Sequence, residues 1–294
     1  MLSGVMLLWF LLTAMAVIFV AWDIRSTPES PVLKAGFVLL TCYTGPLGAF
    51  LYVLGCREPL PGLHEQYIAA RWRQALGSTM HCVAGDGVGI LAGAVIGAWI
   101  HLPRPVELIL EYVLGFAFGW MIFQALFMRD MAGGSYARSL RSTFLPELLS
   151  MNFLMAGMTP VMTLAMKVTP NSHNPLGPTF WFVMSMALVT GFVVAYPMNW
   201  WLVANHLKHG MMTVRKRDQA EDNKSIQEHR MDHHGAMSNS GHAADAATPG
   251  HSHKSSEHTA PLPSAGRMGA MTLLSFVVFG IGLAIAWAFG GFNG

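Results

Sequence analysis

The chain has 294 residues, of which 53% are hydrophobic and only 12% are charged, and its mean hydropathy is +0.42. Soluble domains carry about a quarter charged residues, so this composition excludes an ordinary soluble enzyme. The net charge of +2 leaves no basic excess for binding nucleic acid. The cysteines Cys42, Cys56 and Cys82 lie in or beside apolar runs without paired spacing, which argues against a disulfide framework or a CxxC metal knuckle.

Seven long apolar runs dominate the sequence. A helix of about 20 apolar residues crosses the hydrocarbon core of a bilayer, so the runs predict an all-α, polytopic transmembrane helix bundle of about seven spans. They fall near residues 4–22, 35–56, 79–100, 105–128, 144–166, 179–205 and 268–290. The first run lacks the basic flank and the small-residue cleavage site of a signal peptide, and we interpret it as a retained span.

The polar segments between the runs predict the domain organisation and the orientation. We expect a six-span bundle over residues 1–206, a disordered His-rich loop over 207–267, and a seventh span with a short tail over 268–294. Cytoplasmic loops retain Lys and Arg. With seven spans, 14 of the 18 Lys and Arg residues fall on one side. This split predicts that the amino terminus and the His-rich loop are cytoplasmic and that the carboxyl terminus is outside.

Glycines recur at i, i+4 positions in the third and fourth runs. Such a strip lets a neighbouring helix backbone approach closely, so we assign these glycines to helix packing and not to chemistry. They are Gly85, Gly89, Gly93 and Gly97 in the third run, and Gly115 and Gly119 in the fourth.

The polar segment 207–267 contains a cluster of histidines. Seven of the 13 histidines of the chain fall within residues 229–258. Imidazole is a favoured ligand for zinc, copper and nickel, and the closely spaced histidines can wrap an ion without a preformed cage. The best candidates are His233, His234, His251 and His253. In composition the loop resembles those between the spans of several zinc transporter families; the alternative is a solvated linker or a pH-responsive tail.

Five methionines form a stripe in the fifth run. At about 100° per residue they fall within an arc of about 80°, along a length of about 22 Å. They are Met151, Met155, Met158, Met162 and Met166. Thioethers are soft, uncharged ligands that prefer Cu(I), and the MxxxM spacing resembles that of the Ctr copper importers. The alternative is ordinary core packing. Pro160 within the stripe predicts a kink.

Ionisable side chains within the spans are candidates for function because they are costly in a membrane. Three runs are predicted to bring ligand-type residues to the cytoplasmic face. These residues are His81, Cys82 and Asp86; Glu147 beside Met151; and His206 with His209. Alternatively, Asp86 pairs with a nearby cation and His81 is a hydrogen-bonded bundle residue. On the outer face, Glu107 and Glu111 either collect a cation or complement the helix dipole.

Three stretches carry a family resemblance: HCVAGDGVG, LPELLSMNFLMAGMTPVM and YPMNWWLVANHLKHGM. Over roughly residues 65–215, the chain resembles a bacterial family of polytopic membrane proteins catalogued as domain of unknown function 4396. The resemblance implies a location in the bacterial inner membrane and assigns no activity.

The leading hypothesis is transport or homeostasis of a transition metal, with Cu(I) favoured and Zn(II) or nickel second. In this hypothesis the methionine stripe forms the passage, and His81, Cys82, His206 and His209 form its inner gate. The sequence contains neither a GxxxxGK[ST] loop nor a hydrolytic Ser/His/Asp pattern, so we predict no bound nucleotide and no enzymatic activity. Transport is then passive, ion-coupled or driven by a partner, and Asp86 or Glu147 is the candidate carrier of a coupling proton.

Two other functions fit the same sequence. The first is a non-transporting membrane scaffold or a metal-delivery subunit of a larger complex. The second is haem b held between two histidines, for which His81 and His206 form the best pair. Besides the lipid bilayer and a metal ion, the expected partners are a metallochaperone or a membrane oxidase, and a homo-oligomer is also compatible with the sequence.

Overall fold

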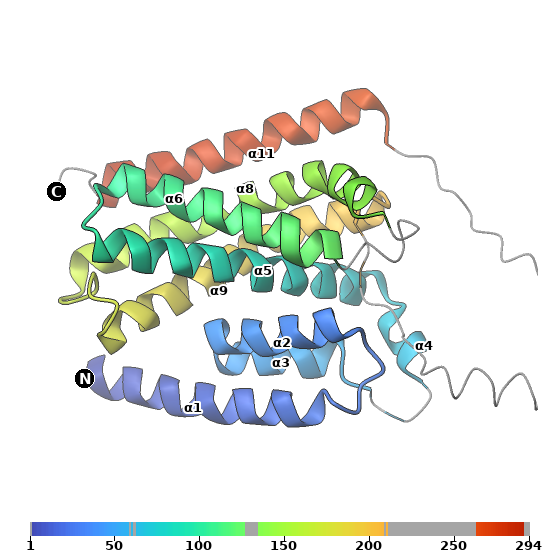
Figure 1. Ribbon diagram of the computed structural model, residues 1–294, viewed down its shortest axis with the longest axis horizontal. Coiled ribbons are helices and arrows are strands. Elements are labelled where there is room, and N and C mark those ends of the chain that lie inside the picture. The colour runs from blue at the N-terminus through green and yellow to red at the C-terminus, as the bar shows by residue number, and fades with distance from the viewer. Residues whose placement is uncertain are drawn as a thin grey trace, which may run out of the picture. The chain divides into compact units, whose positions relative to one another are not determined.

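The structure is a computed structural model that describes residues 2–58, 60, 63–126, 135–208, 210 and 263–290. Within these residues it contains helices and no strands, so the all-α prediction is confirmed (Figure 1). The helices are α1 (Leu2–Asp23), α2 (Pro31–Thr44), α3 (Pro46–Gly55), α4 (His64–Ile68), α5 (Arg71–Trp99), α6 (Arg104–Ala117), the π-helical η1 (Phe118–Gln124), α8 (Tyr136–Val168), α9 (Pro178–Ala204), α11 (Ala265–Ile285) and the π-helical η2 (Ala286–Gly290).

Six helices of the described chain are long and apolar enough to cross a membrane, and not seven. They are Ser3–Asp23, Arg71–Trp99, Arg104–Gln124, Tyr136–Val168, Pro178–Ala204 and Ala265–Gly290. The third of them joins α6 to η1, and the sixth joins α11 to η2. With six crossings, the first span starts on the side of the membrane where the last span ends. The start of α1 and the end of α11 lie at the same end of the bundle in Figure 1.

The predicted second span, residues 35–56, is broken into the two short helices α2 and α3. Gly45 separates them with φ of +62°, a left-handed conformation that glycine adopts without strain, and Pro46 then starts α3. The Tyr52 hydroxyl near the end of α3 lies 3.0 Å from Thr27 Oγ1, in the segment before α2, and donates to Asp23 at the end of α1, at 2.8 Å. The chain therefore enters and leaves on the same side, as a re-entrant hairpin.

Helix α1 covers this hairpin. A Cβ built on Gly45 would lie 2.7 Å from Thr13 Oγ1 and 2.8 Å from the Trp9 ring, so α1 packs directly on the turn. Its opposite side carries apolar residues such as Met15, which is 67% exposed and suited to lipid. Irregular backbone is tolerated at membrane depth where protein buries it, and α1 provides that cover.

The glycine strip of α5 packs against α6, as predicted. A Cβ on Gly93 would lie 2.8 Å from the Glu111 Cα, one on Gly97 would lie 2.6 Å from the Glu107 Cγ, and one on Gly89 would collide with the Leu114 carbonyl. The absence of side chains at these positions therefore brings α5 and α6 into backbone contact. Helix α8, which runs unbroken through Pro146 and Pro160, packs against α5, α6, α9 and α11.

Candidate functional site

A buried ammonium group lies inside the bundle, where α5 and α8 meet the end of α9. The Lys208 Nζ donates to Cys82 Sγ at 2.7 Å, to Glu147 Oε2 at 2.8 Å and to Asn199 Oδ1 at 3.2 Å. The side chains of Lys208 and Glu147 are both 0% exposed. The Cys82 thiol also donates to Glu147 Oε2, at 3.3 Å. We call the residues Cys82, Asp86, Glu147, Asn199 and Lys208 the Lys208 cluster.

Lys208 reaches this position because the chain turns back sharply after α9. His206 adopts φ of +58°, the Leu207 N–H bonds to the Leu202 carbonyl at 2.9 Å, and the His206 N–H bonds to the Val203 carbonyl at 3.1 Å. This is the Schellman pattern, in which a residue with positive φ ends a helix. The prediction of His206 as a gate ligand, or as a haem ligand with His81, is not supported, because His206 is exposed at this turn while His81 is buried.

Substitutions of His206 test this role. We expect His206→Gly to keep or raise stability by about 1 kcal/mol, because glycine adopts positive φ without a steric cost, and His206→Val to lower it by about 1–2 kcal/mol. Unfolding in mixed micelles measures both. A larger loss for the glycine variant than for the valine variant would contradict the capping role.

Asp86 and Glu147 approach each other across Gly119, which lies in the π-helical segment η1. A Cβ on Gly119 would collide with Asp86 Oδ1 and lie 3.0 Å from Glu147 Oε1. Among the described residues, the hydrogen bond that Asp86 makes is to Glu147, and neither oxygen of Asp86 nor Oε1 of Glu147 receives one from an amide, hydroxyl or ammonium donor. Two buried carboxylates against one Lys208 ammonium leave one negative charge unbalanced, which favours uptake of a proton or another cation here.

Polar neighbours complete the surroundings of the cluster. His81 is 3% exposed, hydrogen-bonds to Gln124 of η1, and packs its ring edge-on against Phe123 at 5.7 Å between centroids. Asn199 donates to Ser150 Oγ at 2.8 Å. The π-helical segment therefore contributes both the gap at Gly119 and the contact to His81, and such segments are common at functional sites.

The methionine stripe is buried along its whole length. Met151, Met155 and Met158 are 0% exposed, Met162 is 2% and Met166 is 4%. At one end, the Met151 methyl group and the Asp86 carbonyl would both contact a Cβ on Gly115, at 2.8 and 3.3 Å. At the other end, Arg104 donates to Met166 Sδ at 2.8 Å. A cavity of about 250 Å³ elsewhere, lined by residues that include Trp9, Tyr43 and Trp181, involves none of the five.

The two carboxylates predicted on the outer side lie beside the far end of this stripe. Glu107 forms an ion pair with Arg104 at 2.6 Å, and the same Arg104 contacts Met166. Glu111, one turn further along α6, is 0% exposed, and neither of its carboxyl oxygens has a hydrogen-bond partner among the described residues. One face of α6 and η1 thus presents Glu107, Glu111 and Gly119 in that order. The Asp86 carboxyl group occupies the space that a side chain at Gly119 would take.

The sequence-predicted candidates divide into four groups, the first being Met155, Met158, Met162 and Met166, which lie buried along the stripe beyond the Lys208 cluster. Cys82, Asp86 and Glu147 are brought together with Met151 alongside, and His81 lies next to them in the chain. His206 lies apart, at the exposed turn. The remaining candidates, which lie outside the described residues, are His209, His233, His234, His251 and His253. Lys208, Ser150 and Gln124 were not predicted, because nothing in their local sequence distinguishes them from loop or packing residues.

One comparison with known proteins matches a region of the chain that includes the Lys208 cluster. Residues 71–208 match the model of a family described as Domain of unknown function (DUF4396). No curated protein and no solved structure matches the chain. The matching region begins at the first residue of α5 and ends at Lys208, so it contains every member of the Lys208 cluster. Over residues 71–208, just under half of its length, this bundle of membrane helices is similar to the DUF4396 family.

Proposed function

We propose that the protein transports a transition-metal cation in exchange for protons, and that the Lys208 cluster is the site where the two compete. The observation that carries the proposal is the contact of the buried Lys208 ammonium with Cys82 and Glu147, next to the Asp86 carboxyl group, which has no cation of its own. A site that holds an ammonium among a thiol, two carboxyl groups and an amide offers ligands that a metal cation also takes. Lys208 then acts as a built-in cation that an arriving ion displaces.

Charge supports exchange with protons. The cluster has one more acidic group than basic groups, and an uncompensated charge inside a bundle is costly, so a proton on the Asp86–Glu147 pair balances the resting state. A metal cation that enters would release that proton, and a divalent one would also move the Lys208 ammonium. Glu111 and Glu107, further along α6, provide further carboxyl groups between the cluster and the opposite membrane face.

The methionine stripe supports a soft metal. Its five thioethers run from Met151, beside Asp86, to Met166, beside Arg104 and Glu107. At 1.5 Å per residue this length is about 22 Å, so the stripe connects the two acidic regions across most of the membrane. Cu(I) is the metal that thioethers prefer, and Zn(II) or nickel is the second choice.

The six-span topology changes the proposed orientation. When Lys and Arg are assigned by their position between the six spans, 16 of the 18 lie on the side of the His-rich segment, and Arg104 and Lys167 lie on the other. We therefore place the His-rich segment in the cytoplasm, as predicted, and both termini outside, which reverses the prediction for the amino terminus. In this arrangement the histidines of residues 229–258 receive or store metal on the cytoplasmic side.

Metal and proton fluxes in proteoliposomes test the proposal. We expect the wild-type protein to move Cu(I), and Zn(II) more slowly, with protons moving in the opposite direction. The triple variant Met155→Leu, Met158→Leu, Met162→Leu should lose at least about tenfold in Cu(I) flux with its fold intact, because Leu conserves packing volume and removes the ligand. Fluorescent metal and pH indicators inside the vesicles measure both fluxes.

A matched control replaces methionines that face outward. Met15 and Met121 are 67% and 44% exposed, and the double variant Met15→Leu, Met121→Leu should keep the wild-type flux. Asp86→Asn should abolish the proton movement that accompanies metal. Metal flux equal to that of protein-free vesicles would overturn the proposal, and a stably copurifying protein would then favour the scaffold or delivery role.

A further inference from the structure

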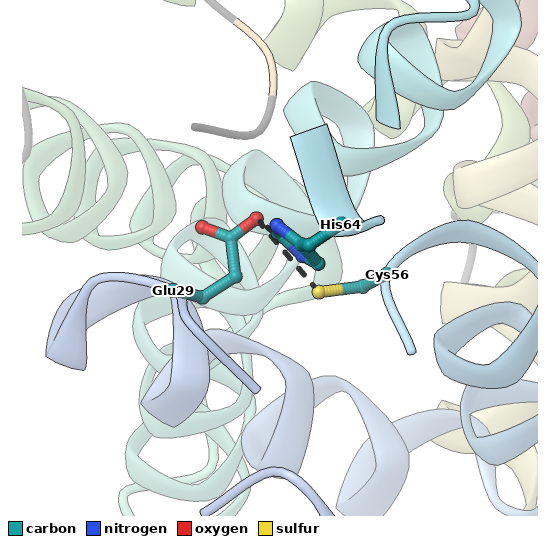
Figure 2. Close-up of side chains that lie close together, drawn as sticks. All are labelled: Glu29, Cys56 and His64. Atoms are coloured by element: carbon teal, nitrogen blue, oxygen red, sulfur yellow. Dashed lines mark hydrogen bonds and ion pairs between the residues drawn. The ribbon is translucent and has the colours of Figure 1, made fainter. Parts of the chain in front are cut away.

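Three ligand-type side chains outside the family region meet where the α2–α3 hairpin begins and ends. Glu29 precedes α2, Cys56 follows α3, and His64 starts α4. Figure 2 shows the carboxyl group of Glu29 facing both the His64 ring and the Cys56 sulfur. The distances are 3.6 Å from Glu29 Oε1 to His64 Nε2 and 3.9 Å from Cys56 Sγ to Glu29 Oε1. All three ligand atoms lie within 4.8 Å of one another.

These residues are buried and are held by a surrounding network. Glu29, Cys56 and His64 are 4%, 0% and 1% exposed. Arg57, next to Cys56, makes two contacts of 2.9 and 3.0 Å with Asp23. Together with the contacts of Tyr52, these bonds connect the loop that carries Glu29 to the end of α3. The His64 ring also hydrogen-bonds to the backbone of Cys56, an arrangement that typically fixes the ring of a metal-ligating histidine.

We propose that Glu29, Cys56 and His64 form a metal site for Zn(II) or a similar divalent cation. A carboxylate, a thiolate and an imidazole are the three ligand types that zinc takes in proteins. With metal–ligand distances of about 2.0–2.3 Å, ligands of a tetrahedral site lie about 3.3–3.6 Å apart. The two separations from Glu29, 3.6 and 3.9 Å, are a few tenths of an ångström longer, and the one between Cys56 and His64 is at most 4.8 Å, so side-chain movements of about an ångström or less close the site. Three protein ligands leave the fourth position to water.

The protonation of His64 and Cys56 is consistent with such a site. Burial lowers the pKa of His64 below its ordinary value, which keeps its imidazole in the neutral form that binds metals. Burial also raises the pKa of the Cys56 thiol well above its ordinary value. A thiolate at this position therefore needs a cation beside it, and a bound metal provides one.

The consequence is a metal that links the re-entrant hairpin to its flanking segments. Glu29 and Cys56 lie at the two ends of the hairpin, and His64 connects them to the chain leading into α5. This inference does not depend on the transport proposal, because none of the three residues belongs to the Lys208 cluster or to residues 71–208.

Cobalt absorption of the purified full-length protein tests the site. Co(II) replaces Zn(II) and reports a thiolate ligand by a sulfur-to-metal charge-transfer band in the near ultraviolet. We expect this band in the wild-type protein, its loss on adding Zn(II), and its absence in Cys56→Ser. The protein has two other cysteines, so Cys42→Ser and Cys82→Ser are matched controls that should retain the band.

Each other outcome has a defined meaning. A wild-type protein without the band, or a band that survives Cys56→Ser, overturns the site. A band lost in Cys82→Ser but not in Cys56→Ser places the metal at the Lys208 cluster, which also overturns this inference and supports the proposed function. Glu29→Gln keeps the thiol and the side-chain size and should weaken Co(II) binding about tenfold or more, so the test remains decisive even if Cys56→Ser does not fold.

Discussion

Lys208→Met should destabilise the bundle by about 3–5 kcal/mol, because it leaves the Glu147 carboxylate buried without its cation. Lys208 and Glu147 are 2.8 Å apart and both side chains are 0% exposed, so solvent cannot compensate for the loss. Methionine retains most of the length of the lysine side chain, which confines the change to charge and hydrogen bonding. Unfolding by SDS in mixed micelles, followed by circular dichroism, measures the difference in free energy.

A double-mutant cycle separates the ion pair from packing. Glu147→Gln removes the charge that Lys208 balances, so Glu147→Gln with Lys208→Met should recover a large part of the loss. Lys167→Met is the matched control: its ammonium donates to the Phe289 carbonyl at an exposed position, and we expect little change. If Lys208→Met were as stable as Lys167→Met, Lys208 would not be the buried partner of Glu147.

Gly89→Ala should be the most disruptive single methyl addition in the glycine strip, with a loss at the upper end of about 1–3 kcal/mol. Its Cβ would collide with the Leu114 carbonyl, which is backbone and cannot rotate away. The variant must therefore push α6 from α5, and with it Gly119 from Asp86. Unfolding in mixed micelles measures the loss of stability, and the proteoliposome assay measures the accompanying loss of metal flux.

Gly280→Ala is the matched control for Gly89→Ala. Gly280 lies in α11, and a Cβ built there meets nothing within 4 Å. Alanine also favours a helix over glycine, so we expect stability to be unchanged or to rise by about 0.5–1 kcal/mol. Equal effects of the two variants would mean that α5 and α6 do not pack through Gly89.

Most of the fold was predictable because long apolar runs identify membrane helices. Six of the seven runs match helices of the structure to within several residues. The run 35–56 failed because hydropathy alone does not distinguish one span from two short helices. The Gly45–Pro46 pair was the available signal, since such a dipeptide marks a turn.

The site was predictable only in part. Cys82, Asp86 and Glu147 stand out because charged or thiol groups within apolar runs must face the bundle interior. Lys208 does not stand out, because it follows α9 among loop residues and enters the bundle only through the turn at His206. No local feature of the sequence indicates that this histidine turns the chain instead of binding an ion.

The group of Glu29, Cys56 and His64 was not predicted for a related reason. Cys56 was expected to end a span on the side of the membrane opposite to Glu29. Once α2 and α3 form a hairpin, the two residues become neighbours, and His64 reaches them from α4. A change in one predicted element thus changes which distant residues meet, which no reading of local spacing anticipates.

The re-entrant hairpin also constrains the order in which the chain assembles. Its turn at Gly45 is covered by Trp9 and Thr13 of α1, while Leu76 and Ala84 of α5 pack against Gly55 and Gly36 in its two arms. Alone in lipid, α2 and α3 would leave this turn exposed to hydrocarbon. The hairpin therefore needs α1 to cover its turn and α5 to pack against its arms, so we expect roughly the first hundred residues to fold as one unit during synthesis.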